Sequence, residues 1–431
     1  MRGYFDAALF GIKPSTQEDQ TASLQQALDA AGVAGGVVEL GAGQYLVAGS
    51  LRIPPGVCLR GMNQAPQYTR TLKGTVILAT GGRDNEAGPA LIEMGESSAA
   101  KGFTVFYPEQ SIDDVHPYAW TFHLFSFDQT VENITLVNSY NAIQCGPENN
   151  GRHILRNVYG TALRRGLLVD YCTDIGRVEN VHWHCHWWGS LLQRGGQTDP
   201  VFTYMGEHCE AFIFARADWE YVLNTFVFPC NIGYRFIKSP IPGLVGQDAA
   251  NGSLLGIGAD LAQVAVQVDR VQFNGIAITN GEFAAFLGEH PTGVLVGPDC
   301  IGTVRLENCS FWGDFAQVVV SHNQHVTSVQ NCTLQTWGER YKKFPQIEAD
   351  SGKLQVRGNT FTLSGLPKGQ TQIIEMPEKP AGVEVRVNKG VQFAVISENT
   401  GTHGIHVVNE IGSRAIIANN EPPKEIPYPA V

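Results

Sequence analysis

The sequence has few charged residues and no long apolar run. Lys, Arg, Asp and Glu together make up 16% of its 431 residues, against roughly 25% in an average soluble protein. No stretch approaches the ~20 apolar residues that a bilayer-spanning helix needs, so we expect no membrane partner. The opening residues, Met1 to Asp6, lack the apolar core of a signal peptide. Localisation therefore stays open between the cytoplasm and secretion with a signal already removed.

Basic residues are outnumbered by acidic ones. The chain has 30 Lys and Arg against 41 Asp and Glu, which gives a net charge of −11. A nucleic-acid-binding protein needs a positive surface for the phosphates, so we expect no nucleic acid as a partner. A homo-oligomer stays possible.

Nine cysteines are scattered along the chain without a CxxC pair. Neither a disulfide framework nor zinc-ribbon spacing is present, and we expect no metal or other cofactor. Hydrophobic residues make up 43% of the chain, which is enough for a large core and excludes a disordered protein.

A short pattern recurs through the sequence: alternating apolar and polar residues, then Asn, then a further alternating stretch. Successive occurrences are 24, 23, 44, 46, 38, 23 and 28 residues apart, which fits a unit near 23 residues with insertions. The pattern is centred, in order, on Asn133, Asn157, Asn180, Asn224, Arg270, Asn308, Asn331 and Asn359. A period of this length indicates a repeat architecture.

Within each unit, period-2 stretches alternate with turns, and no helical pattern of useful length intervenes. A unit this short buries its apolar face only by stacking on the next one. The sequence therefore predicts one all-β domain over residues 1–431, a right-handed parallel β-helix (solenoid) of about ten coils. We expect Asn amides of successive coils to form a hydrogen-bonded ladder at an interior bend. Cys309 and Cys332 should stack inside as small apolar residues.

Both ends of such a stack expose unpaired backbone groups. Residues 1–34 are expected to form an N-terminal cap on an amphipathic helix that opens at Glu18-Asp19-Gln20-Thr21 and stops at Gly32. Coils should fill residues 35–420. The proline-rich tail, residues 421–431, cannot extend a sheet.

The N-terminal region carries a recognisable signature. Asp19, Thr21, Gln25 and Ala27 fit a D-x-T-x-x-x-Q-x-A helix, which is followed by G-G-V-V-x-L, by G-x-Y and by a coil from Ser50 to Gly61. This resembles the pectate-lyase superfamily of right-handed parallel β-helix proteins, the group related to glycoside hydrolase family 28. The resemblance implies a carbohydrate-active enzyme: a hydrolase, lyase, epimerase or phage tail depolymerase. The polygalacturonase motifs of family 28 do not occur in order, so no catalytic residue is carried over.

Longer additions to the repeat lie near residues 187–210, 238–262 and 275–292. We expect them to be loops that wall a groove on one sheet. Trp187 and Trp188 in the first addition are candidates for stacking on sugar rings, with packing between loop and coil as the alternative.

Asp218 and Glu220 lie two residues apart on a predicted strand, so both are expected on one face with Cα atoms roughly 6.5–7 Å apart. Asp218 and Asp174 each lie six residues before an Asn of the repeat, so in-register coils place them roughly 4.8 Å apart. Gly176 should leave room beside Glu220. In such a cluster one carboxyl has a raised pKa while another stays charged, as glycosidic cleavage requires. We predict Asp218 and Glu220 as the catalytic pair, tuned by Asp174; the alternative is that Asp residues cap turns and Glu220 is a surface residue.

His182, His184 and His186 alternate along a predicted strand. His-x-His on a strand binds zinc or copper, but beside Trp188 it equally suits a sugar-binding face. We predict His184, His186 and Trp188 as substrate contacts and assign no metal.

Four further residues are predicted to contact substrate: Asp170, Arg216, Arg235 and Lys238. The three basic ones suit a uronate carboxylate or a lyase base, and their alternative is a solvated turn. Reserve acids in the insertions are Asp199, Glu207, Glu210, Glu282 and Glu289.

The favoured function is a glycoside hydrolase that acts on a polysaccharide or oligosaccharide by carboxylate acid/base catalysis. The net negative charge favours a neutral glycan over a polyuronate. The alternatives are a polysaccharide lyase, which performs β-elimination on a uronate-containing glycan, and a non-enzymatic glycan-binding β-helix.

Overall fold

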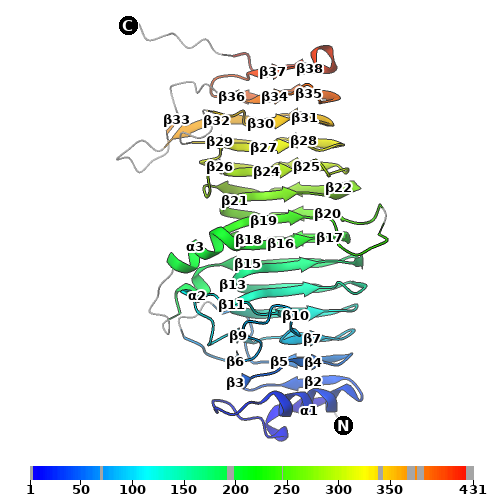
Figure 1. Ribbon diagram of the computed structural model, residues 1–431, viewed down its shortest axis with the longest axis vertical. Helices are drawn as coiled ribbons and strands as arrows, with labels where there is room; N and C mark the ends of the chain where they lie inside the picture. The colour runs from blue at the N-terminus through cyan, green and yellow to red at the C-terminus, as the bar shows by residue number, and fades with distance from the viewer. Residues whose placement is uncertain are drawn as a thin grey trace. The chain divides into compact units, whose positions relative to one another are not determined.

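The computed structural model describes residues 3–67, 71–191, 199–244, 246–337, 343–365, 374–375 and 383–423. Strands account for 50% of the chain and helices for 9%, which confirms the predicted predominance of β-structure. The chain divides into two compact units, Met1–Pro229 and Cys230–Val431. In each unit, parallel strands of successive coils lie side by side (Figure 1). In the described ranges, no helix is long and apolar enough to cross a membrane.

Three ladders of parallel strands build the first unit, and we call them sheets A, B and C. Sheet A contains β1 (Tyr4–Asp6), β2 (Gly36–Glu39), β5 (Val57–Arg60), β8 (Ala99–Lys101), the first parts of β11 (Thr130–Cys145), β13 (Ile154–Val169) and β15 (Arg177–His184), and β17 (Ala217–Leu223). Sheet B contains β3 (Gly43–Val47), β6 (Thr75–Ala79), β9 (Thr104–Phe106), the following parts of β11, β13 and β15, and β18 (Phe226–Phe228). Sheet C contains β4 (Leu51–Ile53), β7 (Ile92–Met94), β10 (Trp120–Leu124), the ends of β11 and β13, and β16 (Glu210–Phe214). Short bridges join β12 (Asn150–Gly151), β14 (Cys172–Asp174) and β17.

The second unit repeats this arrangement in sheets D, E and F. Sheet D contains β20 (Ala250–Leu255), β22 (Val271–Thr279), β25 (Val304–Glu307), β28 (Val326–Gln330), β31 (Lys353–Arg357), β35 (Phe393–Ser397) and β38 (Ala415–Ala418). Sheet E contains the start of β21 (Gly258–Val268), β23 (Glu282–Ala285), β26 (Ser310–Gly313), β29 (Thr333–Thr336), β32 (Thr360–Gly365) and β36 (Thr400–Gly401), with β33 (Ile374–Glu375) antiparallel to β32. Sheet F contains β19 (Cys230–Phe236), the end of β21, β24 (Thr292–Val296), β27 (Gln317–Ser321), β30 (Ile347–Ala349), β34 (Val385–Val387) and β37 (Val407–Asn409).

Helices are short and few. The first unit has the 3-10 helix η1 (Ala7–Phe10) and the helices α1 (Thr21–Gly32), α2 (His186–Gly189) and α3 (Asp199–His208); the second has the 3-10 helix η4 (Gly412–Arg414). The predicted N-terminal helix is confirmed as α1, whose buried face includes Leu24 and Leu28 and packs against β2 and β4. Asp19 Oδ1 accepts the backbone N–H groups of Thr21 and Ala48, both at 3.0 Å. The role of α1 as a cap stays a prediction.

The Asn repeat of the first unit marks the corner between sheets A and B. Asn133, Asn157, Asn180 and Asn224 all have left-handed φ angles of 50–56°, which Asn tolerates better than other side chains of its size. Asn157 donates to Asn133 Oδ1 at 3.0 Å, and Asn180 donates to Asn157 Oδ1 at 2.7 Å. The predicted ladder is therefore confirmed. Its predicted interior position is wrong here, because these four side chains are half-exposed or exposed.

In the second unit the left-handed corner residues are Gly256 and Asn280, not Arg270. Gly adopts this conformation without a Cβ penalty, so the coil at Gly256 carries no Asn for the repeat to reveal. The 46-residue gap after Asn224 is thus two coils rather than one coil with a large insertion.

A second ladder lies inside the second unit. Asn359 donates to Asn399 Oδ1 at 3.0 Å, and both side chains are buried. Cys309 and Cys332 precede this ladder in the stack, and the backbone N–H of Cys332 donates to Asn359 Oδ1 at 2.9 Å. Both cysteines are buried, as predicted.

Only the first of the three expected groove loops is a true insertion. Its described residues form α2 and α3, and residues 192–198 of this prediction lie outside the described residues. The second range, 238–262, includes β20 and the start of β21, and the third, 275–292, consists largely of β22 and β23. Most residues of these two ranges are coil strands, because the missing Asn at Gly256 made regular coils look like additions. Of the expected tail, residues 424–431 lie outside the described residues.

Asn157→Ala is expected to lower the free energy of unfolding by about 2–3 kcal/mol, because alanine is strained at a left-handed φ and makes no amide hydrogen bonds. Asn157→Gly keeps the backbone relaxed and removes only the hydrogen bonds, so its loss should be about 1 kcal/mol. Thermal or urea unfolding of the two variants measures the difference. Equal losses would show that the bend imposes no strain on alanine.

Candidate active site

Four residues at one register position of sheet C form a row across neighbouring coils. Trp120 on β10 pairs with Asn141 on β11, Asn141 with Arg165 on β13, and Arg165 with Glu210 on β16. Adjacent strands lie about 4.8 Å apart, so three spacings separate Trp120 from Glu210 by roughly 14 Å. We call this set the sheet C row. It places an aromatic ring, an amide, a guanidinium and a carboxylate in one line.

A second carboxylate joins the sheet C row from the segment before β7. Glu86 Oε1 accepts a hydrogen bond from Asn141 Nδ2 at 3.2 Å and lies 3.4 Å from Arg165 Nη1. Next to Arg165, Arg164 Nη1 lies 3.5 Å from Glu210 Oε1. The Glu86 side chain is 41% exposed and that of Glu210 is 13% exposed. Two carboxylates, each beside an arginine, are therefore accessible from solvent.

Two tyrosines belong to the same group of charges. Burial raises the pKa of Tyr204, on α3, to about 12, and nearby Tyr140 and Glu86 act in the same direction against Arg164. Burial also raises the pKa of Tyr140, and Glu86 adds to that rise. Both phenols keep their protons at neutral pH and are available as hydrogen-bond donors.

A cavity of about 220 Å³ adjoins the row at Trp120. Asn85, Tyr107 and Tyr118 line it together with Trp120. The guanidinium of Arg165 lies over the Trp120 ring, 6.0 Å from its centroid. The cavity is smaller than the ~300–1,000 Å³ of pockets for drug-sized ligands, so it suits one small group rather than a whole chain.

Asp218 and Asp174 stack in neighbouring coils, as predicted, with the Ile175 N–H donating to the Asp218 carbonyl at 3.2 Å. Each carboxylate also has an arginine partner. Arg152 Nη1 lies 2.6 Å from Asp174 Oδ2, and Arg216 forms an ion pair with Asp218. The arginines offset the repulsion between carboxylates on which the predicted acid/base cluster depended.

The predicted common face of Asp218 and Glu220 is wrong. Trp219 between them has a left-handed φ of 55°, which interrupts the alternation of a regular strand. Glu220 consequently points into the coil, where it is 3% exposed and its Oε1 lies 3.0 Å from His153 Nε2. Gly176 leaves the room that was predicted, because a Cβ there would lie 2.2 Å from Glu220 Oε2. An enclosed glutamate of this kind does not face a glycan on the surface, and it is not the surface residue of the alternative interpretation either.

Asp170 and Arg216 are likewise internal. Each is 4% exposed, and Asp170 Oδ1 accepts the backbone N–H groups of Tyr171 at 2.8 Å and Arg216 at 3.1 Å. These contacts hold a turn between coils together, so the two side chains are poorly placed to clamp a substrate.

The two predicted basic contacts of the second unit are engaged in ion pairs. Arg235 Nε lies 3.1 Å from Asp269 Oδ2, and Lys238 Nζ lies 3.6 Å from Asp248 Oδ2. Lys238 and Asp248 line a cavity of about 630 Å³. Contact of Arg235 and Lys238 with substrate stays a prediction.

The three histidines do not share one strand, because β15 ends at His184 and His186 begins α2. Burial lowers the pKa of His182 to about 4 and that of His184 to about 3, so both rings are neutral. Phe228 stacks on His184 with ring centroids 4.6 Å apart. Trp188 is 1% exposed and packs inside the unit, as its alternative interpretation held, so it is closed to a sugar ring.

The parallel register, the left-handed corners and the three ladders of each unit define a parallel β-helix. Solved structures with this fold confirm the predicted resemblance to right-handed β-helix carbohydrate enzymes. No protein-family model matches the sequence, and no curated protein matches it.

Three of the similar structures illustrate the range. The A-module of the mannuronan C-5 epimerase AlgE6 from Azotobacter vinelandii aligns with a TM-score of 0.57 and 14% identity, over 97% of this chain and 100% of that chain. DFA-IIIase from Arthrobacter chlorophenolicus A6, in complex with GF2, aligns with a TM-score of 0.52 and 10% identity, over 97% and 98% of the two chains. The pre-mature gene product 12 of bacteriophage phi29 aligns with a TM-score of 0.54 and 12% identity, over 93% of this chain and 53% of that chain.

Glu220→Gln is expected to lower the free energy of unfolding by about 3 kcal/mol, because it leaves the buried His153 ring without its counter-charge. Turnover per folded molecule should stay near that of the wild type. Circular dichroism during heating measures the first quantity and an activity assay the second. Glu179→Gln, on the neighbouring strand β15 and partly exposed, is the matched control and should change neither.

The same pair makes the loss dependent on pH. Burial by itself lowers the pKa of His153, but Cys145 and Glu220 outweigh it and hold the pKa well above the usual value. A histidine pKa raised by folding stabilises the protein below the unfolded-state value of about 6.5, and this contribution is lost as pH rises through the folded-state pKa. The stability gap between the wild type and Glu220→Gln should therefore be full in mild acid and shrink in alkali. A gap that is constant across this range would contradict a charged pair.

Proposed function

We propose that this protein is an enzyme that acts on carbohydrate, and specifically a glycoside hydrolase that cleaves a polysaccharide or oligosaccharide at the sheet C row. The observation that carries the proposal is the presence of two accessible carboxylates, Glu86 and Glu210, each beside an arginine within this one row. The mannuronan epimerase modules, which share the fold, support carbohydrate as the class of substrate.

Hydrolysis of a glycosidic bond uses two carboxyl groups that flank it. One donates a proton to the oxygen that leaves. The other either takes a proton from the attacking water or bonds to the anomeric carbon before water replaces it. Glu86 and Glu210 supply these two groups, and the proton released by water returns the pair to its starting state.

The remaining members of the site position the glycan. Trp120 offers a ring face to a sugar, and the neighbouring cavity accepts a small group at that end of the row. The phenols of Tyr140 and Tyr204 donate hydrogen bonds to sugar hydroxyls. The reserve acid Glu210 was identified from the sequence by its place in the first insertion, and it takes the catalytic role first predicted for Asp218 and Glu220.

Glu86→Gln and Glu210→Gln are each expected to lower turnover by about 100-fold, because each removes a group that transfers a proton or bonds to the sugar. Melting temperatures should change little, since the two side chains lie near the surface. Release of reducing ends from a panel of neutral and uronate-containing glycans measures the activity.

Two further variants make this experiment decisive. Glu96→Gln, an exposed acid of the same unit outside the row, should keep full activity. Asp218→Asn should also keep it; if it abolishes turnover while Glu210→Gln does not, the active site lies at the Asp174–Asp218 turn and the proposal is wrong. Binding of glycans without turnover in the wild type would identify a glycan-binding protein instead.

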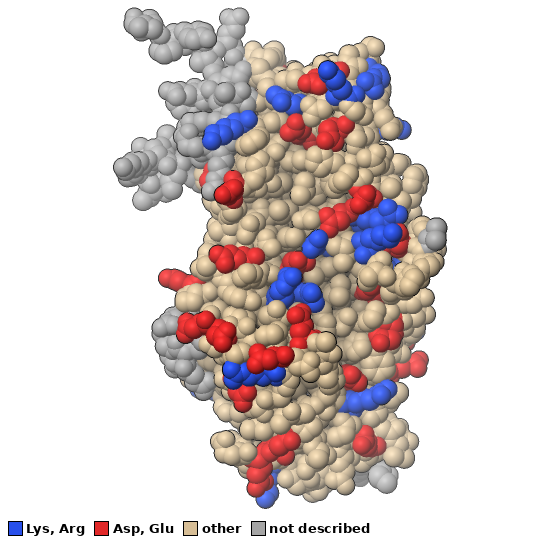
Figure 2. All heavy atoms as spheres, in the orientation of Figure 1, with Lys and Arg blue, Asp and Glu red and all other residues tan. Residues whose placement is uncertain are grey.

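The adjacent arginines favour a second candidate, a polysaccharide lyase. In β-elimination a cation neutralises the uronate carboxylate, a base removes the neighbouring carbon-bound proton, and an acid protonates the oxygen that leaves. Arg164 and Arg165 are each 33% exposed and provide the cations, and Tyr204 provides a protonated phenol. On the face shown in Figure 2, however, acidic and basic side chains are interspersed over a largely uncharged surface, which offers a polyanion no extended basic track.

Arg165→Gln separates the two reactions. A lyase should lose about 100-fold in turnover on a uronate-containing glycan, because the carboxylate of the substrate loses its cation. A hydrolase of neutral glycans should lose less than about tenfold, since Arg165 then only orients Glu86. The product provides an independent test: an unsaturated uronate absorbs in the ultraviolet, whereas hydrolysis yields reducing ends without that absorbance.

A further inference from the structure

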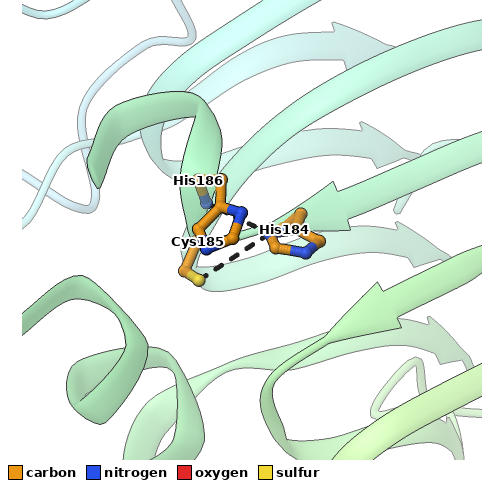
Figure 3. Close-up of side chains that lie close together, drawn as sticks. All are labelled: His184, Cys185 and His186. Carbon is orange, nitrogen blue, oxygen red and sulfur yellow. Dashed lines mark hydrogen bonds between the residues drawn. The ribbon is translucent and has the colours of Figure 1, made fainter. Parts of the chain in front are cut away.

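Three consecutive residues at the junction of β15 and α2 offer metal-binding atoms to one another. The ligand atoms of His184, Cys185 and His186 all lie within 4.8 Å of each other. Figure 3 shows the two imidazoles and the thiol gathered where the strand passes into the helix. In a regular strand Cys185 would point away from both histidines, so it is the start of α2 that brings the three together.

The contact between Cys185 and His184 has the dimension of a shared metal ion. Cys185 Sγ lies 3.7 Å from His184 Nδ1, which is long for a productive hydrogen bond. A zinc ion bound at about 2.3 Å to sulfur and 2.0–2.1 Å to nitrogen, with a tetrahedral angle, holds these atoms about 3.5 Å apart. His184 Nδ1 accepts the backbone N–H of His186 at 3.1 Å, so its lone pair already points into the junction.

The surroundings keep these groups in a suitable state. Burial and the neighbouring histidines lower the pKa of His184, so its ring is neutral and carries a free lone pair. Cys185 is fully buried, while both histidines remain partly exposed and offer a path for entry. Beside them, the buried His182 Nε2 has no hydrogen-bond partner among the described residues, and its ring centroid lies 5.7 Å from that of His184.

We propose that His184, Cys185 and His186 bind one zinc-class metal ion, in place of the metal-free sugar face expected from the sequence. Two imidazole nitrogens and one thiolate form the mixed N/S set that zinc prefers, and water completes the coordination. On binding, the ion replaces the thiol proton of Cys185, which is released to solvent. The site is separate from the sheet C row, and the inference does not depend on the proposed function.

Cobalt(II) is the probe, because it takes zinc sites and reports its ligands by absorption. The intact protein, treated with a chelator and freed of it, should bind one Co²⁺ per chain with a thiolate-to-cobalt charge-transfer band, and Zn²⁺ should displace it. Cys185→Ser should abolish the band and weaken Zn²⁺ binding by at least about 100-fold. His186→Gln, a milder change at a partly exposed side chain, should weaken binding by at least about tenfold.

Cys58→Ser is the matched control, because Cys58 is the partly exposed cysteine of the described chain and lies outside the junction. It should leave the band and the affinity unchanged. Absence of a charge-transfer band in the wild type, its persistence in Cys185→Ser, or its loss in Cys58→Ser would each overturn the proposal. If Cys185→Ser does not fold, as judged by circular dichroism, unchanged Zn²⁺ affinity in a folded His186→Gln protein overturns it equally.

Discussion

The left-handed bend after each sheet A strand is the constraint on which the rest of the first unit depends. Asn133, Asn157 and Asn180 repeat the same backbone conformation and donate or accept amide hydrogen bonds along the stack. A bend that is identical in every coil delivers the next strand to sheet B in the same register. Register decides which side chains face inward, since a slip of one residue reverses every face. The alignment of Trp120 with Glu210 across four coils therefore depends on corners that lie far from the row.

Much of this fold is visible in the sequence, because the corner selects for a rare residue property. Few side chains other than glycine and Asn occupy left-handed φ angles at low cost, so a recurring Asn reports the coil length directly. The method fails where glycine takes the corner, as at Gly256, since glycine is also common in ordinary turns. Counting coils from Asn alone then turns regular coils into apparent loops, which explains the error at residues 238–262 and 275–292.

The candidate site was harder to predict for a related reason. Trp120, Asn141, Arg165 and Glu210 precede their next Asn by 13, 16, 15 and 14 residues, respectively. Register shifts in the pairing of β11 with β13 absorb these differences, and such bulges leave no reliable mark in the sequence. Asp218 and Glu220 show the opposite failure. Their spacing fits a shared strand face, but one left-handed residue between them, Trp219, turns Glu220 into the core.

The direction of the sheet C row has a consequence for how such a protein changes over evolutionary time. The row runs across the strands, so the distance between its two ends alters only by whole coils, in steps of about 4.8 Å. Duplication or loss of a coil between β10 and β16 would lengthen or shorten the platform by one such step. Point substitution at a register position would instead exchange one chemical group and leave the spacing as it is. The length of glycan accommodated and the chemistry performed on it are thereby open to separate genetic changes.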